Sequence, residues 1–105
     1  MDILVVGGTG TIGSAVVSNL QHDHNVIIAG HSSGEVQVDL ADPSSINRLY
    51  QSVGIVDAVV SCAGEAAFGG LEELTDEDFD VSLSNKLMGQ VNLVRQGIDA
   101  VRDGG

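Results

Sequence analysis

The sequence ILVVGGTGTIG, residues 3–13, joins a short apolar run to a glycine-rich turn. Its continuous apolar start is typical of a strand that is buried in a parallel sheet. A helical pattern follows, because Ile12, Ala15, Val16 and Leu20 recur at the spacing of one helix face. A strand, a glycine turn and a helix in this order predict a β-α-β unit of the dinucleotide-binding kind.

The glycines at positions 7, 10 and 13 each have a physical role at such a turn. Gly7 permits the tight turn off the strand, Gly10 lets the backbone approach a pyrophosphate, and Gly13 allows the helix to pack closely on the strand. The free N–H groups and the positive dipole end of the helix attract phosphates, and threonine hydroxyls add donors. We therefore expect the cofactor phosphates to be held by Gly7, Thr9, Gly10, Thr11, Ile12 and Gly13. The alternative is a purely structural glycine-rich turn in an unrelated α/β domain.

Three further runs that are rich in apolar residues, at 26–29, 36–40 and 56–61, predict strands that alternate with helices. This alternation favours an α/β fold with a parallel sheet. Little more than the turn at residues 31–34 separates the first two of these runs. Because a usual parallel connection needs about a dozen residues, we expect an irregular or truncated crossover there.

Two more helical regions are expected in the second half of the chain. One begins with Asp42 as its cap and Pro43 in its first turn, and ends at Gly54. A loop then leads from the last strand to a long helical region that is capped at Thr75 and interrupted near Ser84. One face of this region is traced by Leu87, Val91, Val94, Ile98 and Val101.

The chain is strongly acidic, with 15 Asp and Glu against four Lys and Arg and a formal net charge of −11. Such a surface repels nucleic-acid backbones, so no nucleic acid partner is expected. Backbone N–H groups must then hold a cofactor phosphate. The acidic composition fits a salt-loving host and neutral sequence drift toward acidic residues equally well.

Cys62 is the single cysteine, which excludes an internal disulfide and fits a reducing compartment. We therefore expect the protein in the cytoplasm. The sequence has no signal-peptide pattern and no long apolar span. No membrane partner and no metal are expected.

The second apolar run ends in Gly30-His31-Ser32-Ser33 and lacks the acidic residue that commonly holds ribose hydroxyls. Without a carboxylate, a 2′-phosphate is not repelled, and His31, Ser32 and Ser33 can donate hydrogen bonds to it. NADP is therefore expected in preference to NAD. The alternative is that His31 is an ordinary exposed turn residue.

These residues resemble the short-chain dehydrogenase/reductase family, and the resemblance covers the family's N-terminal, cofactor-binding half. The glycine loop is similar to that of the extended and atypical branches. Asp39, which precedes Leu40, resembles the family's adenine-contacting aspartate, and Cys62-Ala63-Gly64 resembles the tail of its Asn-Asn-Ala-Gly motif. The resemblance implies a Rossmann-like doubly wound parallel sheet, truncated to about four strands, with Asp39, Leu40, Cys62, Ala63 and Gly64 beside the cofactor.

The segment Asn85-Lys86-Leu87-Met88-Gly89 resembles the start of the family helix that carries a structural or catalytic asparagine. That asparagine usually lies three residues before the glycine, where this chain has Lys86. Asn85 matches only with a slip of one residue. Either residue is therefore a candidate for the equivalent position.

The departures from the family concern catalysis. Ser61 and Cys62 stand where the family has asparagines, and Cys62 is expected to be a small buried residue rather than a nucleophile. The family's catalytic Tyr-x-x-x-Lys pair has no counterpart, because Tyr50 and Lys86 are the only residues of their types and lie far apart. Whether the chain is an enzyme stays open, and it is expected to be inactive alone.

The resemblance implies that residues 1–105 form one NAD(P)-binding domain without the family's catalytic C-terminal half. The parent reaction is hydride transfer between NADP(H) and the carbonyl or alcohol of a small-molecule substrate. The alternatives are a non-catalytic nucleotide-binding or sensor module and part of an NAD(P)-dependent epimerase or dehydratase. Because Gly104-Gly105 lie where the family turns into a fifth strand, we expect an open edge at the fourth strand, with marginal stability or self-association into a homo-oligomer.

Overall fold

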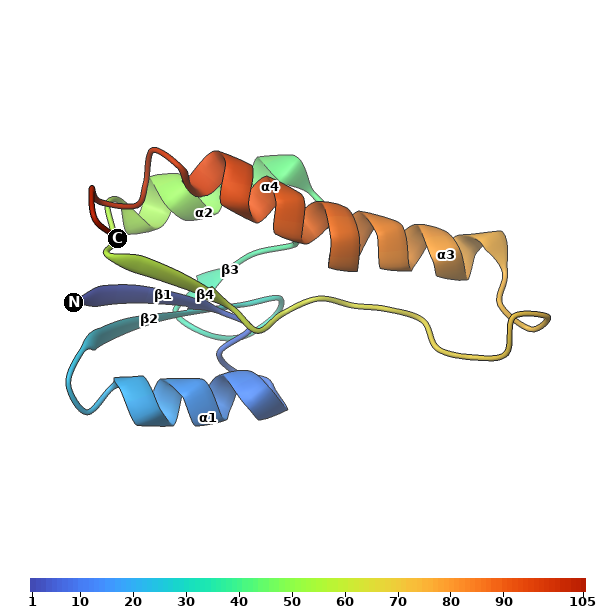
Figure 1. Cartoon of the computed structure of the whole chain (residues 1–105), viewed down its shortest axis with the longest axis horizontal. Coiled ribbons are helices and arrows are strands. Elements are labelled where there is room, and N and C mark those ends of the chain that lie inside the picture. The colour runs from blue at the N-terminus through green and yellow to red at the C-terminus, as the bar shows by residue number, and fades with distance from the viewer.

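The computed structural model describes all of residues 1–105. Its parallel strands form one sheet in the order β3-β2-β1-β4. The strands are β1 (Asp2–Val6), β2 (Asn25–Gly30), β3 (Val36–Gln37) and β4 (Ala58–Ser61). The helices are α1 (Thr11–Leu20), α2 (Pro43–Val53), α3 (Asp76–Ser82), the π-helical turn η1 (Leu83–Leu87) and α4 (Met88–Gly97). Helix α1 covers one face of the sheet while α2 and α4 cover the other (Figure 1), which confirms the doubly wound α/β fold.

Strand β1 lies at the centre of the sheet and is buried on both faces. Leu4 and Val6 point into the larger core cluster, on the side of α2 and α4. Ile3 and Val5 point to the opposite side, where they pack against Val17 of α1. Successive side chains of a strand face opposite ways, so a strand that is covered on both faces reads as an unbroken apolar run.

The connection between β2 and β3 is as short as the sequence indicated. The two strands are parallel, with Ala29 opposite Val36, and only residues 31–35 join them. Gly30 permits this tight path, because a Cβ at that position would overlap the carbonyl oxygen of Ser33. The irregular crossover that we expected is therefore confirmed.

Two strands are shorter than the sequence indicated. The run at 36–40 pairs only through Gln37, because the chain turns toward α2 at Asp39, whose carbonyl oxygen accepts a hydrogen bond from the N–H of Asp42 (3.1 Å). Strand β4 begins at Ala58 rather than at Val56. Val56 instead forms an isolated parallel bridge with Val101.

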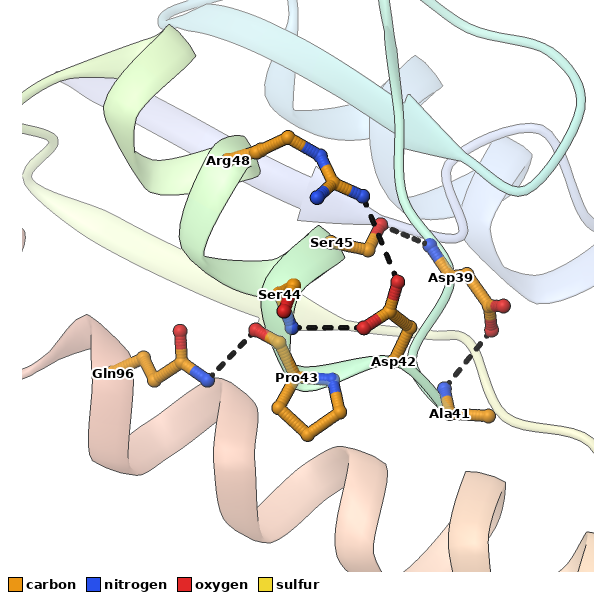
Figure 2. Close-up of polar contacts among 8 residues, drawn as sticks. All are labelled: Asp39, Ala41, Asp42, Pro43, Ser44, Ser45, Arg48 and Gln96. Atoms are coloured by element: carbon orange, nitrogen blue, oxygen red, sulfur yellow. Dashed lines mark hydrogen bonds and ion pairs between the residues drawn. The ribbon is translucent and has the colours of Figure 1, made fainter.

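Helix α2 has the expected cap and its first-turn proline. The carboxylate of Asp42 accepts a hydrogen bond from the N–H of Ser44 (2.9 Å), and Arg48 lies 3.6 Å from the other carboxylate oxygen. The side chain of Gln96 in α4 donates to the carbonyl oxygen of Pro43 (3.1 Å). Figure 2 shows how this contact ties α4 to the start of α2.

The long helical region is continuous, and the expected interruption near Ser84 is a change of helix type. At η1 the helix widens into a π turn, which accommodates one extra residue without ending the helix. The hydroxyl of Ser84 donates to the carbonyl oxygen of Asp80 (2.6 Å) at this point. The side chains before and after the turn therefore differ in helical phase from those of one continuous α-helix.

The outer face of this region is apolar and exposed. Its inner face packs through small residues, since a Cβ on Gly97 would lie 2.5 Å from the hydroxyl of Tyr50. The exposed side chains of the outer face are Phe79, Leu83, Leu87, Val91, Val94 and Ile98. Strand β4 is the edge of the sheet beside it, as expected. None of the helices is long and apolar enough to cross a membrane.

Candidate functional site

A pocket of about 380 Å³ opens at the carboxyl ends of the strands. It is lined by Val6, Gly7, Gly30, His31, Val38, Leu40, Ala63, Gly64, Glu65 and Asn85. The pocket lies where β1 is flanked by β2 on one side and by β4 on the other, so the strand order reverses there. Open α/β sheets bind their ligands at this kind of crevice.

The glycine loop is packed between the ends of β2 and β4. The N–H of Gly7 donates to the carbonyl oxygen of Ala29 (2.7 Å), and a Cβ on Gly7 would lie 2.7 Å from the backbone nitrogen of Ala63. Gly7 also has a φ of +83°, which disfavours any other residue. A Cβ on Gly13 would overlap the carbonyl oxygen of Gly7. These two glycines are therefore required by the packing of the protein itself.

Gly10 differs from the other two glycines. Its backbone is extended (φ −77°, ψ 179°), and a Cβ there would meet only the carbonyl oxygen of Gly7, at 3.4 Å. Any residue can adopt this conformation at that spacing. The fold alone therefore does not require glycine at this position.

The N-terminus of α1 has no partner within the chain. Gly10 is its N-cap and has no side chain to accept a hydrogen bond, and the first turn contains no acidic residue. The first helical hydrogen bond runs from the N–H of Ser14 to the carbonyl oxygen of Gly10 (2.8 Å). The N–H groups of Thr11, Ile12 and Gly13 therefore have no helical acceptor and are available to an anion.

At the end of β2 the three expected polar residues have different surroundings. His31 lines the pocket and is exposed. The hydroxyl of Ser33 donates to the hydroxyl of Thr9 (3.1 Å), which ties this turn to the glycine loop. Ser32 is exposed and does not line the pocket. No Lys or Arg side chain is among the lining residues.

Asp39 is placed beside the pocket rather than in its wall. One oxygen of its carboxylate accepts from the N–H of Ala41 (3.0 Å), and its own N–H donates to the hydroxyl of Ser45 (2.8 Å), as Figure 2 shows. These bonds shape the turn into α2. The neighbouring Val38 and Leu40 line the pocket instead. Val38 was missed by the sequence reasoning, although its alternation with Leu40 is a usable signal.

The end of β4 supplies the opposite wall. Ala63 and Gly64 line the pocket, whereas Cys62 does not. Cys62 is half-buried and packs with the smaller core cluster on the side of α1, so it is the small core residue that we expected. Its N–H donates to the carbonyl oxygen of Val6 (2.7 Å), which continues the sheet into the pocket wall.

The helical region holds this wall in place. The side-chain oxygen of Asn85 accepts from the N–H of Glu65 (2.7 Å), and the side-chain nitrogen of Gln90 donates to the carbonyl oxygen of Ala63 (2.8 Å). Gln90 also accepts a hydrogen bond from the hydroxyl of Ser61 (2.6 Å). The sequence reasoning missed Gln90, because only the fold brings the helix against this loop.

Tyr50 takes no part in the pocket. It is buried on α2, and its hydroxyl donates to the carbonyl oxygen of Leu93 (2.7 Å). Burial raises the pKa of Tyr50 above its ordinary value of 10.0, because the phenolate would be desolvated. Tyr50 is therefore a core residue. No three His, Cys, Asp or Glu side chains gather closely enough to hold a metal ion.

The comparisons with known proteins agree with this geometry. A sequence profile of the NAD dependent epimerase/dehydratase family matches residues 3–96. Among curated proteins, 3-oxoacyl-acyl-carrier-protein reductase MabA of Mycobacterium tuberculosis is 30% identical over an alignment that covers 90% of this chain and 42% of MabA. Short chain dehydrogenase claC of Passalora fulva is 33% identical, with coverage of 73% of this chain and 30% of claC.

Solved structures give the same result. The crystal structure of lin1944 from Listeria innocua matches with a TM-score of 0.97 at 50% identity, and covers 100% of this chain and 52% of lin1944. A small-chain dehydrogenase in complex with NADPH shares the fold, with a TM-score of 0.89 at 23% identity and coverage of 100% of this chain and 48% of that protein. The chain therefore spans 30% to 42% of the length of these curated relatives, and about half that of these solved structures. From the profile match, the sheet order and the glycine loop together, we conclude that the chain belongs to the NAD dependent epimerase/dehydratase family, within the short-chain dehydrogenase/reductase superfamily.

Proposed function

We propose that residues 1–105 form the dinucleotide-binding domain of an oxidoreductase that transfers hydride between NADP(H) and a carbonyl or alcohol of a small-molecule substrate. The observation that carries this proposal is the N-terminus of α1, which has no cap and no acidic residue and lies beside the pocket at the carboxyl ends of the strands. A bound dinucleotide supplies the hydride. The residues of this chain bind it, orient it and keep its phosphates in contact with backbone donors.

The pyrophosphate is assigned to the glycine loop. The N–H groups of Thr11, Ile12 and Gly13 donate to it, and the hydroxyls of Thr9 and Thr11 add donors. Gly7 and Gly10 allow the backbone close to the phosphate oxygens. This donor set suits an anion without basic side chains, which fits the acidic composition of the chain.

The adenosine half is assigned to the side of β2. His31, Ser32 and Ser33 hold a 2′-phosphate there, since no carboxylate follows β2 to repel it. Leu40 contacts the adenine, and Asp39 acts from the adjoining turn with its second carboxylate oxygen, which makes no hydrogen bond within the chain. The other half of the dinucleotide then crosses β1 toward Ala63 and Gly64, with Cys62 supporting that wall from the core.

Reductase activity is proposed from the relatives. MabA is named as a 3-oxoacyl-acyl-carrier-protein reductase, and a further relative from Chlorobaculum tepidum is named as a sepiapterin reductase. Both names describe reductases, and the 3-oxoacyl group in the first name bears a carbonyl. The residues present here supply the cofactor site and contain no Tyr-x-x-x-Lys pair, so we propose that the 105-residue chain binds the dinucleotide but does not turn over substrate.

Calorimetric titration of the purified chain tests the cofactor assignment. We expect saturable binding of NADPH at one site, with NADH bound more weakly. Circular dichroism and thermal unfolding establish that the sample is folded. Absence of heat from either dinucleotide at millimolar concentration, in a folded sample, would overturn the proposal. Equal affinity for NADPH and NADH would overturn only the preference for NADP.

An epimerase or dehydratase activity of a longer protein is the second candidate. Its support is the family profile, which is described as NAD dependent epimerase/dehydratase and covers residues 3–96. The two candidates differ in the fate of the cofactor. A reductase consumes NADPH in proportion to product, whereas an epimerase returns its dinucleotide to the starting oxidation state after each turnover. Absorbance at the reduced-nicotinamide band during turnover by the full-length protein distinguishes them.

Self-association is proposed from the exposed apolar face. Val94 and Ile98 are 70% and 69% exposed, beside the unpaired edge of β4. Exposed edges and apolar faces favour contacts between chains. Size-exclusion chromatography over a range of concentrations is expected to show a homo-oligomer, and a stable monomer at every concentration would contradict this. We also propose the cytoplasm as its compartment, because its one thiol is free.

A further inference from the structure

Lys86 is a cation without a partner in a chain that is rich in carboxylates. The chain has 15 Asp and Glu and only four Lys and Arg. Two of the four basic side chains form ion pairs, Arg48 with Asp42 at 3.6 Å and Arg102 with Asp57 at 2.8 Å. Lys86, the single lysine, makes no ion pair. Its ammonium is therefore free to bind a group from outside the chain.

The side chain of Lys86 lies against the wall of the pocket. A Cβ on Gly64 would lie 2.7 Å from its Cδ and 3.2 Å from its Nζ, so the lysine occupies the space that the glycine leaves empty. Gly64 lines the pocket and has a φ of +138°, a conformation that disfavours other residues. The missing Cβ of Gly64 leaves room for the side chain of Lys86, and the positive φ of Gly64 disfavours a residue that would fill this room. The ammonium is thereby placed at the β4 end of the pocket.

Three side chains of one helical region contact three successive residues of this wall. Asn85 binds the N–H of Glu65, Lys86 lies on Gly64, and Gln90 binds the carbonyl oxygen of Ala63. Asn85 and Lys86 both belong to η1, the π-helical turn. π turns inside α-helices occur frequently at functional sites. The contacts of Asn85 and Gln90 fix the wall, so the position of Lys86 over Gly64 is held from both sides.

The orientation of a dinucleotide decides which of its groups lies there. In this class of fold the residues at the end of the second strand hold the adenosine ribose, and the helix N-terminus holds the pyrophosphate. The remaining ribose then lies on the far side of β1, at the end of β4. Its hydroxyl oxygens are hydrogen-bond acceptors, and an ammonium carries three donors.

We propose that Lys86 is a cofactor-contacting residue whose ammonium donates to the hydroxyls of the ribose in the nicotinamide half. This inference rests on the proposed function, because it requires that the pocket binds a dinucleotide. It assigns Lys86 the task of distinguishing a complete dinucleotide from its adenosine half. A charge-assisted hydrogen bond of this kind contributes about a tenfold difference in affinity.

The test compares three ligands by calorimetry on the full 105-residue chain and on K86M. NADPH and 2′-phospho-ADP-ribose contain the second ribose, whereas 2′-phospho-ADP ends at the pyrophosphate. Methionine keeps an unbranched apolar stem over Gly64 and removes the charge. We expect K86M to bind the two ribose-containing ligands about tenfold more weakly and 2′-phospho-ADP with unchanged affinity. Lys86→Arg is expected to restore part of the difference.

Arg95→Met is the matched control, because Arg95 is also exposed and forms no ion pair, but it lies on α4 and is not among the side chains nearest to Gly64. It removes the same charge and should change none of the three affinities. Equal affinities of K86M and the parent for NADPH would overturn the inference while the proposed function stands. Equal losses for all three ligands would also overturn it, because that pattern shows a general electrostatic or structural effect. If the parent chain is folded and binds no dinucleotide, the proposed function itself fails.

Discussion

The N-termini of α1 and α3 have opposite chemistry. Thr75 caps α3 by accepting a hydrogen bond from the N–H of Asp78 (3.2 Å), and the carboxylate of Asp78 accepts one from the N–H of Thr75 (2.9 Å). The first turn of α3 holds three acidic residues. The first turn of α1 holds none, and Gly10 provides no capping side chain. The N-terminal N–H groups of α1 therefore have no capping side chain within the chain, whereas those of α3 are capped by Thr75 and Asp78.

This difference indicates that the N-terminus of α1 is a site for a negatively charged group from outside the chain. Acidic residues and caps stabilise the positive end of a helix dipole by up to about 1 kcal/mol each. A chain with a net charge of −11 has many carboxylates available, yet none stands at the start of α1. The unfilled N-terminus of α1 is also the one that lies at the switch point of the sheet. A phosphate group would play there the part that Asp78 plays in α3.

Substitution of Gly13 should have the largest effect on stability, because Gly13 lets the start of α1 pack against the glycine loop. In Gly13→Ala the new methyl group would overlap the carbonyl oxygen of Gly7, so helix and loop must separate. We expect a loss of about 3 kcal/mol in the free energy of unfolding. Urea unfolding followed by circular dichroism measures it. Stability equal to that of the parent chain would show that the loop can shift freely.

Gly10→Asp makes the N-terminus of α1 chemically similar to that of α3. The extended backbone at Gly10 suits an N-cap, so the helix should gain a few tenths of a kcal/mol in stability. Dinucleotide affinity should fall about 100-fold, because the carboxylate takes the place of the phosphate and repels it. Calorimetric titration with NADPH measures the change.

Gly10→Asn is the control for charge, since asparagine caps a helix equally well without repelling an anion. Its affinity for NADPH should lie between those of the parent chain and of Gly10→Asp. Unchanged affinity in both variants would contradict the assignment of the pyrophosphate to this loop.

Thr75→Ala removes the cap of α3 and leaves α1 as it is. We expect a loss of about 1 kcal/mol in stability, concentrated at the start of α3. Hydrogen exchange at the amide of Asp78 reports this local loss. NADPH affinity should not change, and a large fall in affinity would mean that the two N-termini are coupled through the loop between β4 and α3.

The smallest effect concerns Tyr50, which lies away from both N-termini. Its folded-state pKa is raised by burial, so its contribution to stability is present below pH 10 and is lost as the pH rises through the folded-state value. Tyr50→Phe removes this alkaline decline and costs about 0.5 kcal/mol at neutral pH, from the lost bond to Leu93. Unfolding curves at several pH values compare the two proteins, and an identical alkaline decline in both would assign the decline to other groups.

The glycine loop and α2 could be predicted in detail because their causes are local. Gly13 is needed because of its contact with Gly7, six positions away, and the positive φ of Gly7 itself favours glycine. The Asp42 cap acts on Ser44, two positions away. The end of β3 could not be predicted in the same way. Apolar and polar residues alternate as far as Leu40, which is a strand pattern, but the hydrogen bonds of Asp39 turn the chain before the strand can extend.

The wall of the candidate site could not be predicted fully from the sequence either. Ala63 and Gly64 were expected beside the cofactor, but the residues that hold this wall are distant in the sequence. Gln90, which binds the carbonyl oxygen of Ala63, is 27 positions away, and Asn85, which binds the N–H of the adjoining Glu65, is 20 positions away. By sequence spacing Lys86 stood at the position of the family's asparagine, and Asn85 was a candidate with a slip of one residue. The fold distinguishes the two residues. Asn85 lines the pocket, whereas Lys86 is not among the lining residues and its side chain lies against Gly64, which is a lining residue.

The sequence by itself determined the order of strands and helices, the glycine turn and the caps of α2 and α3, because each depends on neighbours within about one helical turn. Only the tertiary structure decided that the π-helical turn lies against the end of β4, and that the bare N-terminus of α1 lies beside the same pocket. The physical reason is that these positions are set by the parallel pairing of β1 with β2 and with β4. That pairing brings the carboxyl ends of distant strands to one edge, where their loops meet.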